Sequence, residues 1–131
     1  MVLDTSALLA VLLNEADAPA FRLAIEADPV RLLSAASLVE AAIVIEARVG
    51  EAGGRELDLL LRKAAITIVA VDAEQAELAR QAYRDFGKGR HAAGLHHDDG
   101  FSYALAQFAR APLLFKGDDF SRTDVTVVVL P

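Results

Sequence analysis

Acidic residues stand at four places along this chain. Each place lies near a junction between a short apolar segment and a helical stretch. Asp4 follows Met1-Val2-Leu3, Glu40 lies early in a helical stretch, and two acidic pairs occur at Asp98-Asp99 and Asp118-Asp119. Carboxylate oxygens are the ligands that Mg²⁺ and Mn²⁺ prefer in proteins. A divalent cation held by such a group orients water for attack on a phosphodiester. That chemistry requires a fold that brings the four places together.

Each acidic residue also has an explanation that involves no chemistry. Asp4 can cap a first helix, and Glu40 stands three residues after Ser37, which is the spacing of a capping box. Asp98-Asp99 can complement the dipole of the helix that they open, and Asp118-Asp119 can be turn residues. Four independent caps would not need to share one edge of a sheet, so a common edge favours a site.

Other kinds of site fit the chain less well. Gly87-Lys88-Gly89 has neither the spacing of a Walker motif nor a strand before it. The absence of cysteine excludes thiolate nucleophiles and cysteine-ligated zinc. His91, His96 and His97 do not form a helical HExxH pattern, so we expect them in a solvated loop or near the path of a phosphate group.

Strand-like and helix-like segments alternate along the chain. We expect short strands at Met1–Leu3, Val30–Leu33, Ile66–Val71, Leu113–Phe115 and Thr126–Leu130. Helices are expected at Ser6–Leu13, Pro19–Asp28, Ser37–Val49, Gly53–Ala64, Ala73–Phe86 and Asp99–Ala109. This alternation predicts an α/β fold with a central, mostly parallel sheet of about five short strands, flanked by helices. The carboxyl ends of parallel strands share one edge, where ligands gather, and the four acidic places fall at that edge.

Length and composition limit the class of protein. The 131 residues are enough for one domain, covering 1–131, and a net charge of −6 argues against broad nonspecific nucleic-acid binding. It does not exclude a nuclease, because carboxylates around a metal contribute much of that charge. The longest apolar run, Ala7–Leu13, is far shorter than the ~20 residues of a membrane helix. No Lys or Arg precedes Asp4, so we expect no secretory signal, no membrane association and a cytoplasmic location.

Two of the expected helices are apolar nearly all round. Ser6–Leu13 and Leu38–Val49 carry more apolar residues than a helix with one solvated face needs. Deep burial explains this pattern, and so does a homodimer interface.

Four segments, in a fixed order along essentially the whole chain, carry a resemblance to a known family. They are Val2–Leu8, Ser37–Ala41, Ala93–Ala106 and Leu114–Phe120. The third resembles a Leu-Asn-x-Gly-Asp-Cys-x-x-Tyr-Ala-Leu-Ala motif, and the fourth a Lys-Gly-x-Asp-Phe motif. Together they resemble the PIN-domain ribonucleases, and most closely the VapC-type toxins of prokaryotic toxin–antitoxin pairs.

The resemblance implies a role for each acidic residue. Asp4 and Asp99 take the positions of the principal metal ligands, and Glu40 and Asp119 complete an acidic quartet by ligation or by holding water. The catalytic set is therefore Asp4, Glu40, Asp99 and Asp119. A hydroxyl of Thr5 or Ser6 near the metal is a weaker expectation.

The chain departs from the family motif at three positions. His96 stands in place of the usual Asn, Asp98 in place of Gly, and Gly100 in place of Cys. Asp98 beside Asp99, and Asp118 beside Asp119, leave open which neighbour ligates; the alignment favours Asp99.

The resemblance also implies an activity and partners. It implies an Mg²⁺- or Mn²⁺-dependent endoribonuclease that is the toxin of a type II toxin–antitoxin pair, a homodimer held by a cognate antitoxin, with RNA as substrate. We expect phosphate contacts from Lys88, Arg90, Lys116 and Arg122. One alternative is a non-catalytic PIN-like interaction module, which the retention of all four acids opposes. Another is a receiver-type phosphoacceptor domain, but Val71-Asp72 has the pattern of a helix cap.

Overall fold

The computed structural model describes residues 1–89, 91–96 and 98–131, so Arg90 and His97 lie outside the described residues. The strands are β1 (Val2–Leu3), β2 (Leu32–Ser34), β3 (Thr67–Val69) and β4 (Leu113–Leu114). The helices are α1 (Thr5–Leu12), α2 (Ala18–Ala27), α3 (Ala35–Val49), α4 (Glu51–Lys63), α5 (Ala73–Phe86) and α6 (Asp99–Ala109). The predicted alternation of strands and helices is confirmed.

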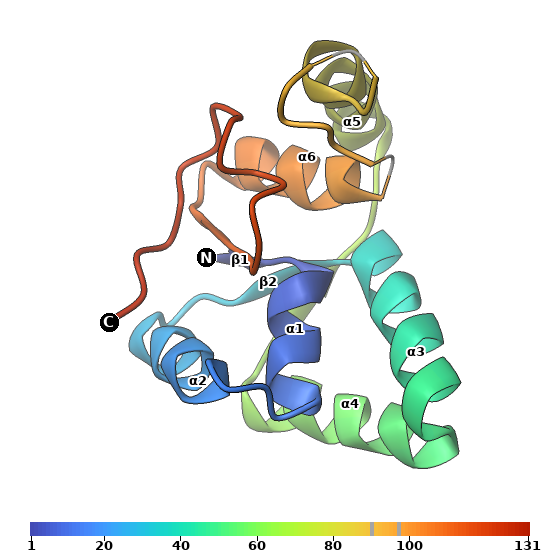
Figure 1. Ribbon diagram of the computed structural model, residues 1–131, viewed down its shortest axis with the longest axis vertical. Coiled ribbons are helices and arrows are strands. Elements are labelled where there is room, and N and C mark those ends of the chain that lie inside the picture. Colours follow the sequence, from blue (N-terminus) through green and yellow to red (C-terminus); the bar gives the residue numbers. More distant parts are fainter. Residues whose placement is uncertain (90, 97) are drawn as a thin grey trace.

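The four strands form one parallel sheet in the order β3-β2-β1-β4. Val2 of β1 lies opposite Leu32 on one side and Leu113 on the other. Helices cover both faces, with α5 and α6 above the sheet and α1, α2 and α4 below it in Figure 1. Val2 packs in the core beneath α6, and Leu3 packs in the core beside α1, because successive side chains of a strand point to opposite faces. The expected α/β fold is confirmed.

The fifth expected strand is reduced to a single bridge. Val127 pairs in parallel with Leu113 of β4, where the Leu113 backbone N–H donates to the Thr126 carbonyl at 2.8 Å. Because β4 contains only two residues, it offers too short an edge for Thr126–Leu130 to extend the ladder. Within the described residues the sheet therefore has four strands, and Val129 is 88% exposed.

The beginning of α3 differs from the expected capping box. Ser34 is the N-cap, and its hydroxyl accepts a hydrogen bond from the Ala36 backbone N–H at 3.3 Å. The interpretation of Ser37 as the cap, with Glu40 reaching back to it, is wrong. Strand β2 ends at Ser34 and the helix follows without a loop, so Ser37 lies inside the first turn and is buried. Glu40 is thereby free of a capping role.

The two strongly apolar helices have different environments. Helix α1 buries Ala7, Leu8, Ala10 and Val11 between the sheet and its neighbouring helices, so burial explains its composition. Helix α3, which lies at the outside of the molecule in Figure 1, leaves Val39 and Ile43 57% and 63% exposed. Among the described residues, no helix combines the length and apolar character that crossing a bilayer requires.

Candidate metal centre

Asp4 lies at the carboxyl end of β1, the strand flanked on both sides by β2 and β4. Its side chain is buried, and both carboxylate oxygens have donors. Oδ2 accepts from the Ser6 backbone N–H at 3.0 Å and from the Ser6 hydroxyl at 2.7 Å. Oδ1 accepts from the Ser102 hydroxyl at 2.6 Å. Asp4 thus caps α1, as expected, and its carboxylate has a fixed orientation at the sheet edge.

Asp99 is the first residue of α6, and its Oδ2 accepts a hydrogen bond from the His96 backbone N–H at 2.9 Å. Burial raises the pKa of Asp99 to about 6. The His96 N–H opposes this rise, whereas the negative charges of Asp4 and Asp119 add to it. Asp99 is therefore close enough to both Asp4 and Asp119 for their charges to affect its ionisation.

Asp119 and His96 lie at the open side of the same cluster. One ligand atom each from His96, Asp99 and Asp119 lies within 4.8 Å of the other two. The Nδ1 atom of His96 is 3.6 Å from Asp99 Oδ2. Asp119 is exposed, but the next residue, Phe120, is buried in the core, and this anchors the loop that carries Asp119.

Glu40 reaches the cluster from α3. Burial raises the pKa of Glu40 to about 7. The Thr5 hydroxyl opposes this rise, and Asp98, through a hydrogen bond and its charge, and the charge of Asp4 add to it. Glu40 therefore lies close to Thr5, Asp98 and Asp4.

The four acidic places of the sequence thus converge at the carboxyl edge of the sheet. Carboxylates gathered in this way repel one another, and without a cation some of them hold protons, which is the direction of both pKa shifts. A set of carboxylate oxygens with one peripheral imidazole is the chemistry of a hard divalent cation such as Mg²⁺ or Mn²⁺. The residues present fit such an ion.

Comparison with known proteins agrees with this geometry. Residues 1–125 match the PIN domain family. The chain is 60% identical to ribonuclease VapC30 of Mycobacterium tuberculosis over 131 residues, which cover all of both proteins. The chain belongs to the VapC family of PIN-domain ribonucleases.

Solved structures show the same fold at low sequence identity. VapC20 of Mycobacterium tuberculosis, a Sarcin-Ricin loop cleaving toxin, has a TM-score of 0.80 at 20% identity and covers 99% of this chain and 98% of its own. A toxin–antitoxin complex from Klebsiella pneumoniae has a TM-score of 0.71 at 19% identity, with coverage of 96% of this chain and 94% of that one. At these identities the likeness concerns the fold.

The acidic neighbours occupy different places in the site. Asp98, where the family motif has Gly, interacts with Glu40, whereas Asp99 belongs to the cluster with Asp119. Asp118 forms a turn, because its carbonyl accepts from the backbone N–H and the hydroxyl of Ser121 at 3.2 and 2.7 Å.

The cationic side chains that we expect to contact phosphate groups differ in their surroundings. The Lys116 ammonium forms ion pairs with Glu15 and, at 3.0 Å, with Asp17. Lys88 and Arg122 are exposed, and Arg122 lines a polar pocket of about 430 Å³ that includes Asp119. Of these cations, Arg122 thus shares a pocket with a residue of the acidic cluster.

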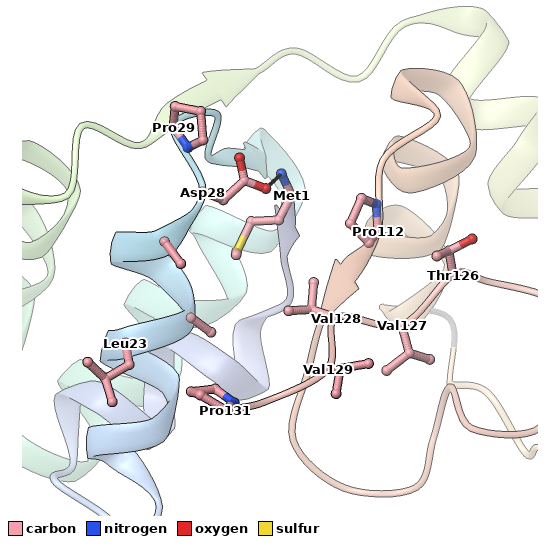
Figure 2. A pocket seen from close by; sticks show the side chains of 12 residues that line it. Met1, Leu23, Asp28, Pro29, Pro112, Thr126, Val127, Val128, Val129 and Pro131 are labelled. Carbon is pink, nitrogen blue, oxygen red and sulfur yellow. Dashed lines mark hydrogen bonds and ion pairs between the residues drawn. The ribbon is translucent and has the colours of Figure 1, made fainter.

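An apolar pocket of about 640 Å³ lies at the other edge of the sheet. Figure 2 shows that Met1, Pro29 and Pro112 surround this pocket. Met1 precedes β1, Pro29 lies before β2 and Pro112 precedes β4, so the pocket is at the amino ends of these strands. Its wall is completed by Leu23 of α2 and by Val127 and neighbouring residues of the C-terminal segment. Its acidic lining residue, Asp28, pairs with the Met1 ammonium at 2.7 Å. The described residues that line this pocket do not include Asp4, Glu40, Asp99 or Asp119.

Sequence reasoning did not identify two serines that contact the site. Ser102 donates to Asp4, and the Ser37 hydroxyl lies 3.1 Å from that of Ser102. A signal was present in their spacing, since Ser102 follows Asp99 by one helical turn and Ser37 precedes Glu40 by one turn.

Proposed function

We propose that this chain is a metal-dependent endoribonuclease, the toxin of a type II toxin–antitoxin pair, which hydrolyses phosphodiester bonds of RNA. Its membership of the VapC ribonuclease family supports the activity. The observation that carries the metal dependence is the convergence of Asp4, Glu40, Asp99 and Asp119 at one sheet edge, with raised pKa values for Glu40 and Asp99. The non-catalytic interaction module is not favoured, because nothing in such a role requires this convergence. We further propose that residues 1–131 act as one nuclease domain.

We assign the roles within the site from this geometry. Asp4 and Asp99 hold Mg²⁺ or Mn²⁺, and Asp119 contributes a carboxylate from the open side. A cation bound there supplies positive charge for the negative charge that develops on the phosphate. Glu40, which lies near Asp4 at the edge of the site, orients the attacking water and accepts its proton.

The charge of the site also supports two partners. An acidic centre attracts a basic side chain, so we propose that a cognate antitoxin inhibits the enzyme by placing an Arg or Lys against the carboxylates. The RNA backbone is expected to approach over the exposed Arg122 and Lys88. Lys116 can join only if a phosphate competes with Glu15 and Asp17 for its ammonium.

We propose that a second copy of the chain covers the exposed face of α3. Val39, Ile43 and Val49 lie on this helix and are 57%, 63% and 52% exposed. Such a concentration of large apolar side chains on one helix is unusual for a surface that faces only water. Because Glu40 is on the same helix, the dimer would also fix the position of α3 beside the site.

The function is tested by RNA cleavage with Mg²⁺ or Mn²⁺ and with EDTA. We expect Asp4→Asn and Asp99→Asn each to reduce cleavage on the order of 100-fold or more, because each removes a charge from the reacting centre. Asp58→Asn is the matched control, since Asp58 is an exposed acid on α4. Cleavage by both site variants at the rate of the control, or full cleavage in EDTA, contradicts the proposal.

A further inference from the structure

Ser102 makes a contact that the acidic quartet alone does not explain. It lies one turn into α6, is fully buried, and donates its hydroxyl hydrogen to Asp4 Oδ1 at 2.6 Å. A serine inside a helix usually bonds back to a carbonyl of its own helix or points to solvent. Here the hydroxyl instead joins α6 to the carboxylate at the end of β1, 98 residues away in the chain.

The hydrogen bond from Ser102 to Asp4 fixes the direction of a second hydrogen bond, between Ser102 and the buried Ser37. The Ser37 and Ser102 hydroxyl oxygens are 3.1 Å apart, and Ser37 is 3% exposed. A serine hydroxyl has one hydrogen, and that of Ser102 is used on Asp4. Ser37 must therefore donate to Ser102, which gives a directed chain from Ser37 through Ser102 to Asp4. Each bond in such a chain polarises the next.

This series of hydrogen bonds connects α3, α6 and the end of β1, which carry Glu40, Asp99 and Asp4. Ser102 stands one turn after Asp99 on α6, and Ser37 stands one turn before Glu40 on α3. The Thr5 hydroxyl, next to Asp4, donates to the Ser37 carbonyl at 3.2 Å and ties α1 to α3 as well. The buried hydroxyl groups of Ser37, Ser102 and Thr5 thus hold together the elements that position the acidic side chains.

We propose that Ser102 is a positioning residue for the metal centre, which orients the Asp4 carboxylate through Oδ1 and is itself held by Ser37. The inference rests on the proposed metal-dependent function. Donors that bond to a ligating side chain control its orientation, and their loss typically weakens metal affinity by ~10- to 100-fold. Among the described residues, the other hydrogen bonds to Asp4 come from Ser6 and reach Oδ2, so the loss of Ser102 removes the donor to Oδ1.

The test is a calorimetric titration of the whole protein with Mn²⁺, accompanied by thermal melting of each variant. We expect Ser102→Ala to weaken Mn²⁺ binding by roughly tenfold or more. Ser37→Ala keeps the bond between Ser102 and Asp4 and is expected to weaken binding by a smaller factor. If Ser102→Ala does not fold, Ser37→Ala carries the test, and affinity equal to that of the wild type then overturns the proposal.

Ala106→Gly separates positioning from general destabilisation. Ala106 lies one turn beyond Ser102 on α6 and is equally buried, but has no contact with Asp4 among the hydrogen bonds of the described residues. Glycine there lowers the melting temperature and is expected to leave the Mn²⁺ affinity within about twofold. The inference is overturned if Ser102→Ala binds as the wild type does, or if Ala106→Gly weakens binding as much as Ser102→Ala.

Asp4→Asn in the same titration tests the metal centre separately from the positioning role of Ser102. Binding by the wild type and its loss in Asp4→Asn support the metal centre, so that unchanged affinity in Ser102→Ala then contradicts the positioning role alone. No Mn²⁺ binding by the wild type contradicts both the metal centre and the positioning role.

Discussion

Asp4 and Asp99 come from opposite parts of the chain, yet the charge of Asp4 contributes to raising the pKa of Asp99. One follows the central strand β1, and the other begins α6, which packs over the same strand. Ser102 adds a direct hydrogen bond between these elements. The relationship means that the ionisation of the site, its stability and its cation affinity are coupled.

The first prediction concerns pH and the metal-free protein. The pKa of Asp99 rises from 3.8 to about 6 on folding, and that of Glu40 from 4.5 to about 7. Between these values the folded state binds more protons than the unfolded state, so the contribution of both groups to stability falls as pH rises from about 4 to 7. Mn²⁺ should offset this loss above pH 7 and have little effect at pH 5, which thermal melting with and without Mn²⁺ measures. An equal Mn²⁺ stabilisation at both pH values is the contrary result.

The second prediction separates the two adjacent acids. Asp99→Asn removes a carboxylate of the central cluster, whereas Asp98→Asn removes a neighbour of Glu40. We expect Asp98→Asn to cleave RNA far faster than Asp99→Asn. We also expect it to lower the pKa of Glu40 and thus shift the acidic limb of the pH–rate profile to lower pH. The reverse order of activities would exchange the roles of these two residues.

The third prediction concerns the loop that carries Asp119. The Tyr103 hydroxyl donates to the Asp124 carboxylate and ties this loop to α6, four residues beyond Asp99. Tyr103→Phe and Asp124→Ala should each reduce the free energy of unfolding by about 1 kcal/mol. The double variant should cost less than the sum, because both remove the same bond. Strict additivity in chemical denaturation would show that the bond contributes nothing.

The fourth prediction concerns the exposed face of α3. Ile43→Arg places a charge at the centre of the proposed homodimer interface and should convert the isolated protein from dimer to monomer in multi-angle light scattering. Leu23→Arg is the matched control, because Leu23 is 56% exposed and its helix, α2, lies on the other side of α1 from α3 in Figure 1. A monomeric wild type at micromolar concentration, or dissociation of both variants alike, contradicts this interface.

The convergence of the acids was predictable because it depends on local signals. Alternating strands and helices require a parallel sheet, and a residue that directly follows a strand, such as Asp4, must lie at its carboxyl edge. The cap of α5 by Asp72, which accepts from the Gln75 N–H at 2.8 Å, follows from a similarly local pattern.

Other features depend on contacts between distant segments and could not be read from the sequence. The Ser37–Ser102 pair spans 65 residues and requires the packing of α3 against α6. The ion pairs of Lys116 with Glu15 and Asp17 join positions about 100 residues apart. The reduced pairing of Thr126–Leu130 also follows from the shortness of β4, since its β-branched sequence alone favours a strand.

The most direct measurement of the central claim is the anomalous scattering of crystals soaked with Mn²⁺ at neutral pH. We expect a peak between Asp4 and Asp99, with carboxylate oxygens of both residues at a coordination distance of ~2.1 Å, close to that of Mg²⁺. The same soak of Asp99→Asn should give no peak there. A peak only at the exposed His96 and Asp119, or none in the wild type, would contradict the assignment of Asp4 and Asp99 as the ligands.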